Sequence, residues 1–148
     1  MSYDVIIYLH SSRFPEPDRL AAEVSAYAPW LALAPFDLRV DEGYVPLAST
    51  GFEVSRWPIT SEDVEEYREA LRADGELNDE NLAMFIESDT TITLGCIDDA
   101  EISAARIVAG ALAKLSNGFV CDPQLDVTVR GDYLPPAEGV NATVDRIR

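Results

Sequence analysis

The single histidine of the chain, His10, is the residue best suited to acid-base chemistry near neutral pH. It follows the strand-like run YDVIIYL and precedes Ser11, Ser12 and Arg13, and strand ends often carry functional side chains. A serine or cysteine nucleophile activated by histidine would have to use His10. Adjacent residues do not define triad geometry, however, and neither serine lies in a G-x-S-x-G elbow. We therefore interpret His10 as a loop or hydrogen-bonded structural histidine.

The sequence contains no motif for a cofactor or a metal ion. Its eight glycines are dispersed, without GxGxxG or GxxxxGK[ST]. The carboxylates of Asp98, Asp99 and Glu101 lack the spacing of a calcium loop, and the first two are better placed to cap a helix. Cys96 and Cys121 belong to no CxxC motif and are interpreted as reduced thiols. We expect no catalytic residue, no metal site and no cofactor.

The most unusual stretch is EDVEEYREALRADGELNDE, residues 62–80, which holds nine acidic residues against two arginines. At 100° per residue, Val64, Tyr67 and Leu71 form one apolar stripe of a helix, and four glutamates lie opposite. Like charges at i,i+4 cost a few tenths of a kcal/mol per pair, and mixed charges would serve solubility better. The sequence therefore predicts a partner-binding surface made of Glu62, Glu65, Glu66, Glu69, Asp74, Glu76, Asp79 and Glu80.

The whole chain is acidic, with 27 acids, 11 bases and a formal net charge of −16. Such a charge attracts cationic partners over a Debye length of about 10 Å in ~0.1 M salt. It disfavours nucleic acid, whose phosphates require lysine and arginine, and also anionic membranes. We predict a basic protein partner, no nucleic acid and no membrane.

The amino terminus lacks the basic and apolar regions of a signal peptide, and no apolar run reaches the ~20 residues of a membrane span. Together with the two unpaired cysteines, this favours a cytoplasmic protein. Arginine supplies nearly all of the bases, which, with the abundant alanine, indicates GC-rich codons and a bacterial source.

Hydrophobic period and turn residues predict the elements that position these side chains. We expect helices at 17–27, 61–74 and 100–116, and strands at 3–9, 36–40, 44–47, 49–57, 82–87, 91–97, 119–122 and 126–131. Residues 82–87 and 91–97 are expected to form a hairpin. The helix at 100–116 is apolar over most of its circumference, apart from a stripe of Ser103, Arg106, Gly110 and Lys114, so we expect it in the core.

This order of elements favours an α+β fold, with about three helices packed on a mainly antiparallel sheet. A ferredoxin-like core with additions is the expected architecture. At 148 residues without linkers or repeats, the chain is expected to form a single domain, 1–148, with 132–148 as a loosely structured tail. Trp30 and Trp57, each beside a proline, are expected to be core lids or exposed interface anchors.

The run AARIVAGALAKLSNGFVCDP, with the earlier GFEV, resembles stretches of small uncharacterised bacterial proteins that are encoded near secreted toxins. The two stretches hold 24 of the 148 residues. It implies an immunity-type protein: small, acidic, cytoplasmic, without catalytic motifs, and acting by binding and neutralising a toxin.

Our hypothesis is accordingly a non-catalytic immunity-type inhibitor that neutralises a basic partner, a toxin acting on nucleic acid or nucleotide, through the acidic surface. One alternative is a small hydrolase or isomerase that uses carboxylates and His10. A second is a homo-oligomeric, ligand-binding ferredoxin-like domain, and a third is acidity that serves only solubility.

Overall fold

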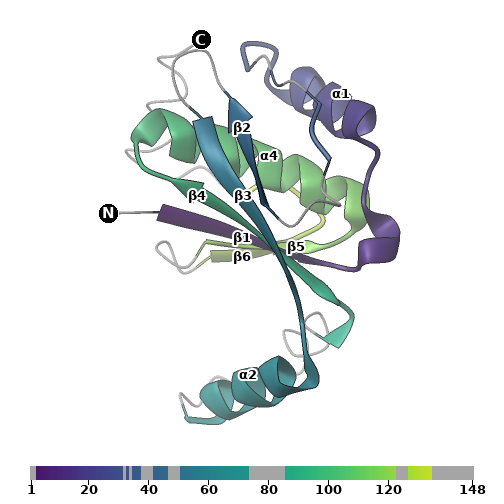
Figure 1. Cartoon of the computed structure of the whole chain (residues 1–148), viewed down its shortest axis with the longest axis vertical. Helices are drawn as coiled ribbons and strands as arrows, with labels where there is room; N and C mark the ends of the chain where they lie inside the picture. The colour runs from purple at the N-terminus through teal and green to yellow at the C-terminus, as the bar shows by residue number, and fades with distance from the viewer. Residues whose placement is uncertain are drawn as a thin grey trace.

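The computed structural model describes residues 3–31, 33, 35–37, 42–46, 51–73, 86–122 and 127–134. Along the chain lie β1 (Tyr3–Leu9), a short 3-10 helix (Ser11–Arg13), α1 (Pro17–Tyr27), β2 (Glu42–Pro46), β3 (Gly51–Pro58), α2 (Ser61–Ala73), β4 (Thr90–Cys96), α4 (Asp99–Ser116), β5 (Phe119–Asp122) and β6 (Val127–Arg130). Figure 1 shows their arrangement.

The six strands form one antiparallel sheet in the order β2-β3-β4-β1-β5-β6. After β1, the chain passes through α1 to the edge strand β2 and returns in β3, which lies across β4 from β1; the connection through α4 runs from β4 to β5 across β1. Two such interleaved β-α-β units are the ferredoxin-like topology, to which β2 and β6 add one strand at each edge. The predicted α+β fold with a ferredoxin-like core and additions is confirmed.

Alternation along the strands divides the sheet into a covered face and an open face. Val5, Ile7 and Leu9 of β1 are buried and belong to the main core cluster with α1 and α4, which lie on the same face of the sheet (Figure 1). The alternate residues, Ile6 and Tyr8, are partly exposed on the other face. Burial of large aliphatic side chains, at about 25 cal/mol per Å² of apolar surface, is what holds the two helices on the sheet.

Helix α4 begins and ends as the sequence predicts. The Asp98 carboxylate accepts a hydrogen bond from the Glu101 backbone N–H at 2.8 Å and caps the amino end. Asn117, at φ 54°, ends the helix in the left-handed conformation. Gly118 then passes so close to β1 that an added Cβ would lie 2.5 Å from the Tyr8 carbonyl oxygen, so only glycine fits there.

The polar stripe of α4 is itself covered, except at Lys114. Gly110 lies directly under Tyr133, where an added Cβ would be 2.3 Å from a ring carbon. Tyr133 in turn stacks on Tyr27 of α1, with 3.7 Å between ring centroids. Tyr133 and Leu134 therefore pack against the core, whereas Asp132 is exposed. The rest of the expected tail, 135–148, lies outside the described residues.

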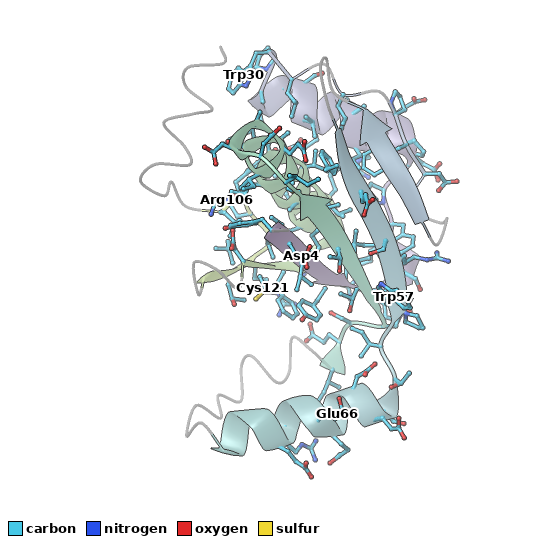
Figure 2. The ribbon with its side chains drawn as sticks, turned by 60° about the vertical axis from the view of Figure 1, so that its left-hand side comes forward. Asp4, Trp30, Trp57, Glu66, Arg106 and Cys121 are labelled. Atoms are coloured by element: carbon cyan, nitrogen blue, oxygen red, sulfur yellow. The ribbon has the colours of Figure 1, made fainter. Side chains whose placement is uncertain are left out.

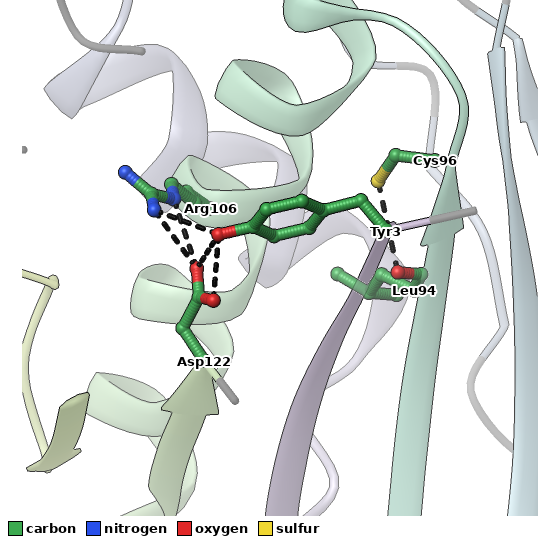
Figure 3. Close-up of polar contacts among 5 residues, drawn as sticks. All are labelled: Tyr3, Leu94, Cys96, Arg106 and Asp122. Atoms are coloured by element: carbon green, nitrogen blue, oxygen red, sulfur yellow. Dashed lines mark hydrogen bonds and ion pairs between the residues drawn. The ribbon is translucent and has the colours of Figure 1, made fainter. Parts of the chain in front are cut away.

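Arg106 of α4 forms a buried polar network with β1 and β5 (Figure 3). Its guanidinium donates to the Asp122 carboxylate through Nη2 at 2.9 Å and Nε at 3.1 Å, and Nη2 also donates to the Tyr3 hydroxyl at 2.9 Å. The Tyr3 hydroxyl donates to Asp122 at 2.6 Å. Asp122 is fully buried and Arg106 is 5% exposed. Burial, followed by the hydrogen bond to Asp122, raises the pKa of Tyr3 to about 12, so the hydroxyl remains a donor at physiological pH.

Two predicted strands are wrong. Phe36 and Asp37 are not in a strand, and β2 instead includes Glu42 and Gly43, which we expected in a turn; residues 38–40 lie outside the described residues. Of the predicted strand 82–87, Ile86 lies in a helical turn, and residues 82–85 lie outside the described residues. The expected hairpin with 91–97 has no place in the sheet, because β4 pairs with β3 on one side and β1 on the other.

The buried network makes a direct prediction for stability. Asp122→Asn leaves the guanidinium charge of Arg106 buried without its counter-charge, so we expect a loss of about 3–5 kcal/mol in the free energy of unfolding. The measurement is urea denaturation followed by circular dichroism.

The control replaces the whole network with apolar groups, as Tyr3→Phe/Arg106→Met/Asp122→Leu. Because no charge is left buried, this triple variant should be closer in stability to the wild type than Asp122→Asn is. A triple variant less stable than the single variant would show that the network contributes more than the avoidance of an unpaired charge.

Candidate functional site

Helix α2 begins with a reciprocal cap. The Thr60 hydroxyl accepts from the Asp63 backbone N–H at 3.2 Å, and the Asp63 carboxylate accepts from the Thr60 backbone N–H at 2.8 Å. This is the capping-box arrangement, with aspartate in the position of the usual glutamate. Glu62 and Asp63 in the first turn also oppose the positive end of the helix dipole. The predicted helix start at Thr60 or Ser61 is confirmed.

The four glutamates predicted for the outer face of this helix, Glu62, Glu65, Glu66 and Glu69, are all exposed. Arg68 forms an ion pair with Glu65 at 3.4 Å, as an i,i+3 pair can. The other four predicted residues, Asp74, Glu76, Asp79 and Glu80, lie outside the described residues, as do Gly75, the predicted helix end, and the side chains of Tyr67 and Leu71.

Helix α2 lies beyond the ends of β3 and β4, apart from α1 and α4 (Figure 1). Among the described side chains of α2, Val64 belongs to a small apolar cluster with Ile59, Tyr8 and Phe119 on the sheet. The chain leaves the sheet after β3 and returns before β4 at one point, since the Ile59 N–H donates to the Asp89 carbonyl at 2.8 Å. The acidic helix is therefore an excursion from two paired strands.

A groove of about 460 Å³ separates the beginning of α2 from the open face of the sheet. In Figure 2, Glu66 on α2 and Trp57 at the end of β3 lie on its two sides. We call this feature the Trp57 groove; its lining residues are Tyr8, Trp57, Pro58, Ile59, Asp63, Glu66 and Thr91. Trp57 is 59% exposed and fits the exposed-anchor interpretation, whereas Trp30 packs against the core as a lid.

Three residues with the types of a hydrolytic triad meet at the end of β1. The Nδ1 atom of His10 lies 2.8 Å from the Ser12 hydroxyl, and its Nε2 atom lies 3.5 Å from the Asp89 carboxylate. The same Nδ1 accepts the Ser12 backbone N–H at 3.2 Å, which makes His10 the cap of the 3-10 helix. His10 is thus a hydrogen-bonded histidine in a loop, as the sequence predicts, and its neighbours are a serine and a carboxylate.

The Asp89 carboxylate is held firmly at this position. It accepts hydrogen bonds from the Ser11 N–H at 2.7 Å, the Ser11 hydroxyl at 2.6 Å and the Thr90 hydroxyl at 2.8 Å. Burial alone would raise its pKa, but the hydrogen bonds from Ser11 and Thr90, with the charge of His10, lower the pKa below its usual range. Asp89 is therefore an anion that can orient His10. The adjacent cavity, about 10 Å³, has room for about one water molecule.

Among the described residues, no group of three histidine, cysteine, aspartate or glutamate side chains is placed to hold a metal ion. Within the same residues, no helix combines the length and apolar character needed to cross a membrane. Both cysteines are free thiols. Cys96 is buried on the covered face, where burial, followed by the charge of Glu101, raises its pKa to about 12.

Comparisons with protein-family models, with curated proteins and with solved structures found no significant match.

The sequence indicated the acidic helix and His10. It did not indicate that Asp89 lies beside His10 or that a groove lies beside the helix. Asp89 lies 78 residues from Ser11, in a segment that we expected to be a hairpin turn. The residues that line the Trp57 groove come from β1, β3, β4 and α2, so no local sequence pattern predicts the groove. The one available signal was Trp57 itself, a large aromatic at the end of a strand and beside a proline.

The two thiols report which face of the sheet each occupies. At about pH 8, a pKa of about 12 leaves roughly one Cys96 side chain in ten thousand as thiolate. We expect Cys121→Ser to leave a protein whose remaining thiol reacts with Ellman's reagent at least about tenfold more slowly than the thiol of Cys96→Ser. Both variants should react equally fast in concentrated guanidinium chloride, and equal rates in the native state would contradict the assignment.

Proposed function

We propose that this is a non-catalytic binding protein, which binds a basic protein partner through the exposed glutamates of α2. The observation that carries the proposal is the position of Glu62, Glu65, Glu66 and Glu69, on a capped helix that lies beyond the sheet. A helix presented in this way exposes its charge to a partner without disturbing the core. Arg68 of α2 is paired with Glu65; the side chain of Arg72, the second arginine of the helix, lies outside the described residues.

Electrostatic attraction supports the proposal quantitatively. Complementary surface charge raises association rates by 10-fold or more at low salt, and the effect falls as salt screens the charges. A protein that covers a phosphate-binding surface gains further affinity, because its carboxylates occupy the positions that phosphates would take. The expected partner is therefore a protein with a basic surface, such as one that acts on nucleic acid or nucleotide.

We further propose the immunity class, a toxin-neutralising protein of the bacterial cytoplasm. This part of the proposal is supported by the resemblance in residues 104–123 and 51–54, together with the small size and acidity of the chain. In the structure, the described residues of those segments form α4, β5 and part of β3, so the resemblance concerns the scaffold and not the acidic helix.

Charge reversal on α2 tests the proposed surface. The variant Glu62→Lys/Glu69→Lys changes two exposed glutamates and leaves the Trp57 groove intact. We expect basic proteins captured from a lysate of the native host by the wild type to be lost by this variant. For a partner so identified, the association rate at low salt should fall about tenfold, with a flatter dependence on salt.

The matched control is Asp4→Lys/Glu53→Lys, which makes the same change in net charge on exposed residues of β1 and β3. This control should retain the captured proteins. If both variants lose them equally, only the net charge matters and α2 is not the binding surface. If neither variant loses any captured basic protein, the proposed function is wrong.

The geometry at His10 favours a second candidate, a small hydrolase with Ser12 as nucleophile, His10 as base and Asp89 as the orienting carboxylate. Its support is the 2.8 Å contact between the Ser12 hydroxyl and Nδ1, which matches the nucleophile-to-base distance of such sites. The cap hydrogen bond at the same Nδ1 competes with this role, so binding remains the preferred function.

A simple assay separates the two functions. If Ser12 is a nucleophile, the wild type hydrolyses p-nitrophenyl acetate, Ser12→Ala loses about 10²-fold or more in rate, and Ser25→Ala, at an exposed serine of α1, does not. As a binding protein, the chain should show no difference between the wild type and Ser12→Ala. Hydrolysis that depends on Ser12 would favour the hydrolase over the binding protein.

A further inference from the structure

The Trp57 groove combines two aromatic side chains with carboxylates, which is an arrangement that recognises a cation. Trp57, Thr91 and Tyr8 lie side by side on three neighbouring strands, because Trp57 pairs with Thr91 and Thr91 pairs with Tyr8. Strands lie about 4.8 Å apart, so the Cα atoms of the two aromatic residues are about 10 Å apart. The small Thr91 between them leaves room for one planar group.

The aromatic wall on the β1 side is fixed in place. The Tyr8 ring stacks on Phe119, with 4.7 Å between centroids and 11° between planes, and Phe119 is 5% exposed. Trp57, on the opposite side, remains 59% exposed. A large exposed tryptophan at the mouth of a groove is the residue type that most often dominates a binding interface.

The third wall, from α2, is negative. Asp63 is positioned by its hydrogen bond to the Thr60 backbone N–H at 2.8 Å. Glu66 is exposed and, within the described part of the chain, takes part in no ion pair. A nucleotide phosphate would be repelled here, and a purely apolar ligand would leave the carboxylates without a counter-charge.

We propose that the Trp57 groove binds an arginine side chain of a basic protein partner, with the guanidinium between Trp57 and Tyr8 and its charge against Glu66. Arginine fits better than lysine, because the planar guanidinium stacks on aromatic rings, is weakly hydrated and bonds a carboxylate through two N–H groups. The inference rests on the proposed function and adds to it a specific anchor: the glutamates on the outer face of α2 attract the partner, and the groove holds one arginine.

Three small peptides test the groove without knowledge of the partner. They are acetyl-Gly-Arg-Gly-amide, the lysine equivalent and the citrulline equivalent, which has almost the shape of arginine without its charge. Titration followed by ¹H–¹⁵N NMR should show saturable shifts of the Trp57 indole N–H and the Thr91 amide with the arginine peptide. The citrulline peptide should bind at least about tenfold more weakly, and the lysine peptide should lie between them.

Two single variants and one matched control locate the site. Trp57→Ala should abolish the saturable shifts at Thr91, and Glu66→Gln should weaken the arginine peptide about fivefold or more. The control, Glu53→Gln, removes one exposed charge from β3 outside the groove and outside α2 and should change the affinity by less than about twofold.

The outcomes distinguish this inference from the proposed function. Equal binding of the arginine and citrulline peptides, or equal effects of Glu66→Gln and Glu53→Gln, would overturn the arginine groove. Shifts confined to Glu62, Glu65 and Glu69 would also overturn the arginine groove, but they would support binding at the acidic surface of α2. Failure of the proposed function appears separately, as basic partners that survive Glu62→Lys/Glu69→Lys.

Discussion

The buried ion pair between Arg106 and Asp122 constrains where α4 can lie on the sheet. Two opposite charges in an apolar interior tolerate little misalignment, since the attraction that offsets their desolvation requires close contact. Here the contact joins α4 to β5, and the Tyr3 hydroxyl extends it to β1. One guanidinium nitrogen, Nη1, has no hydrogen-bond partner. The network therefore links the central helix to two strands, β1 and β5.

Once α4 is fixed, the two faces of the sheet acquire different roles. One face forms the core, in which Val5, Ile7 and Leu9 pack beneath the helices. The other carries Tyr8, Trp57 and Thr91, which border the groove, and approaches only the beginning of α2. A sheet covered on one side supplies a rigid floor on which aromatic side chains are held at strand spacing. The candidate binding features therefore gather on the open face and around α2, while the His10 cluster lies at the end of β1.

Much of the fold could be predicted because its signals are local. Asp98 and Asn117 delimit α4, Pro17 begins α1, and Thr60 begins α2; each acts on backbone groups within one helical turn. The failures were short apolar runs near residues 36–40 and 82–87, where periodicity cannot separate strands from other structures. The candidate sites were predictable only in part. The exposed glutamates of α2 follow from helical period, whereas the contact between His10 and Asp89 and the walls of the groove require pairings between distant residues.

The excursion that carries α2 has a consequence for how this protein can change over evolutionary time. The strands on either side of the excursion are already paired, and the Ile59–Asp89 hydrogen bond closes its base. The residues of the excursion can therefore be replaced without changes in the core. Loops closed at one point tolerate insertion and replacement, since lengthening them costs only a slowly growing entropy. Related chains could therefore keep this scaffold while diverging in the helix between β3 and β4. The partner-binding helix would then evolve faster than the sheet and the core helices.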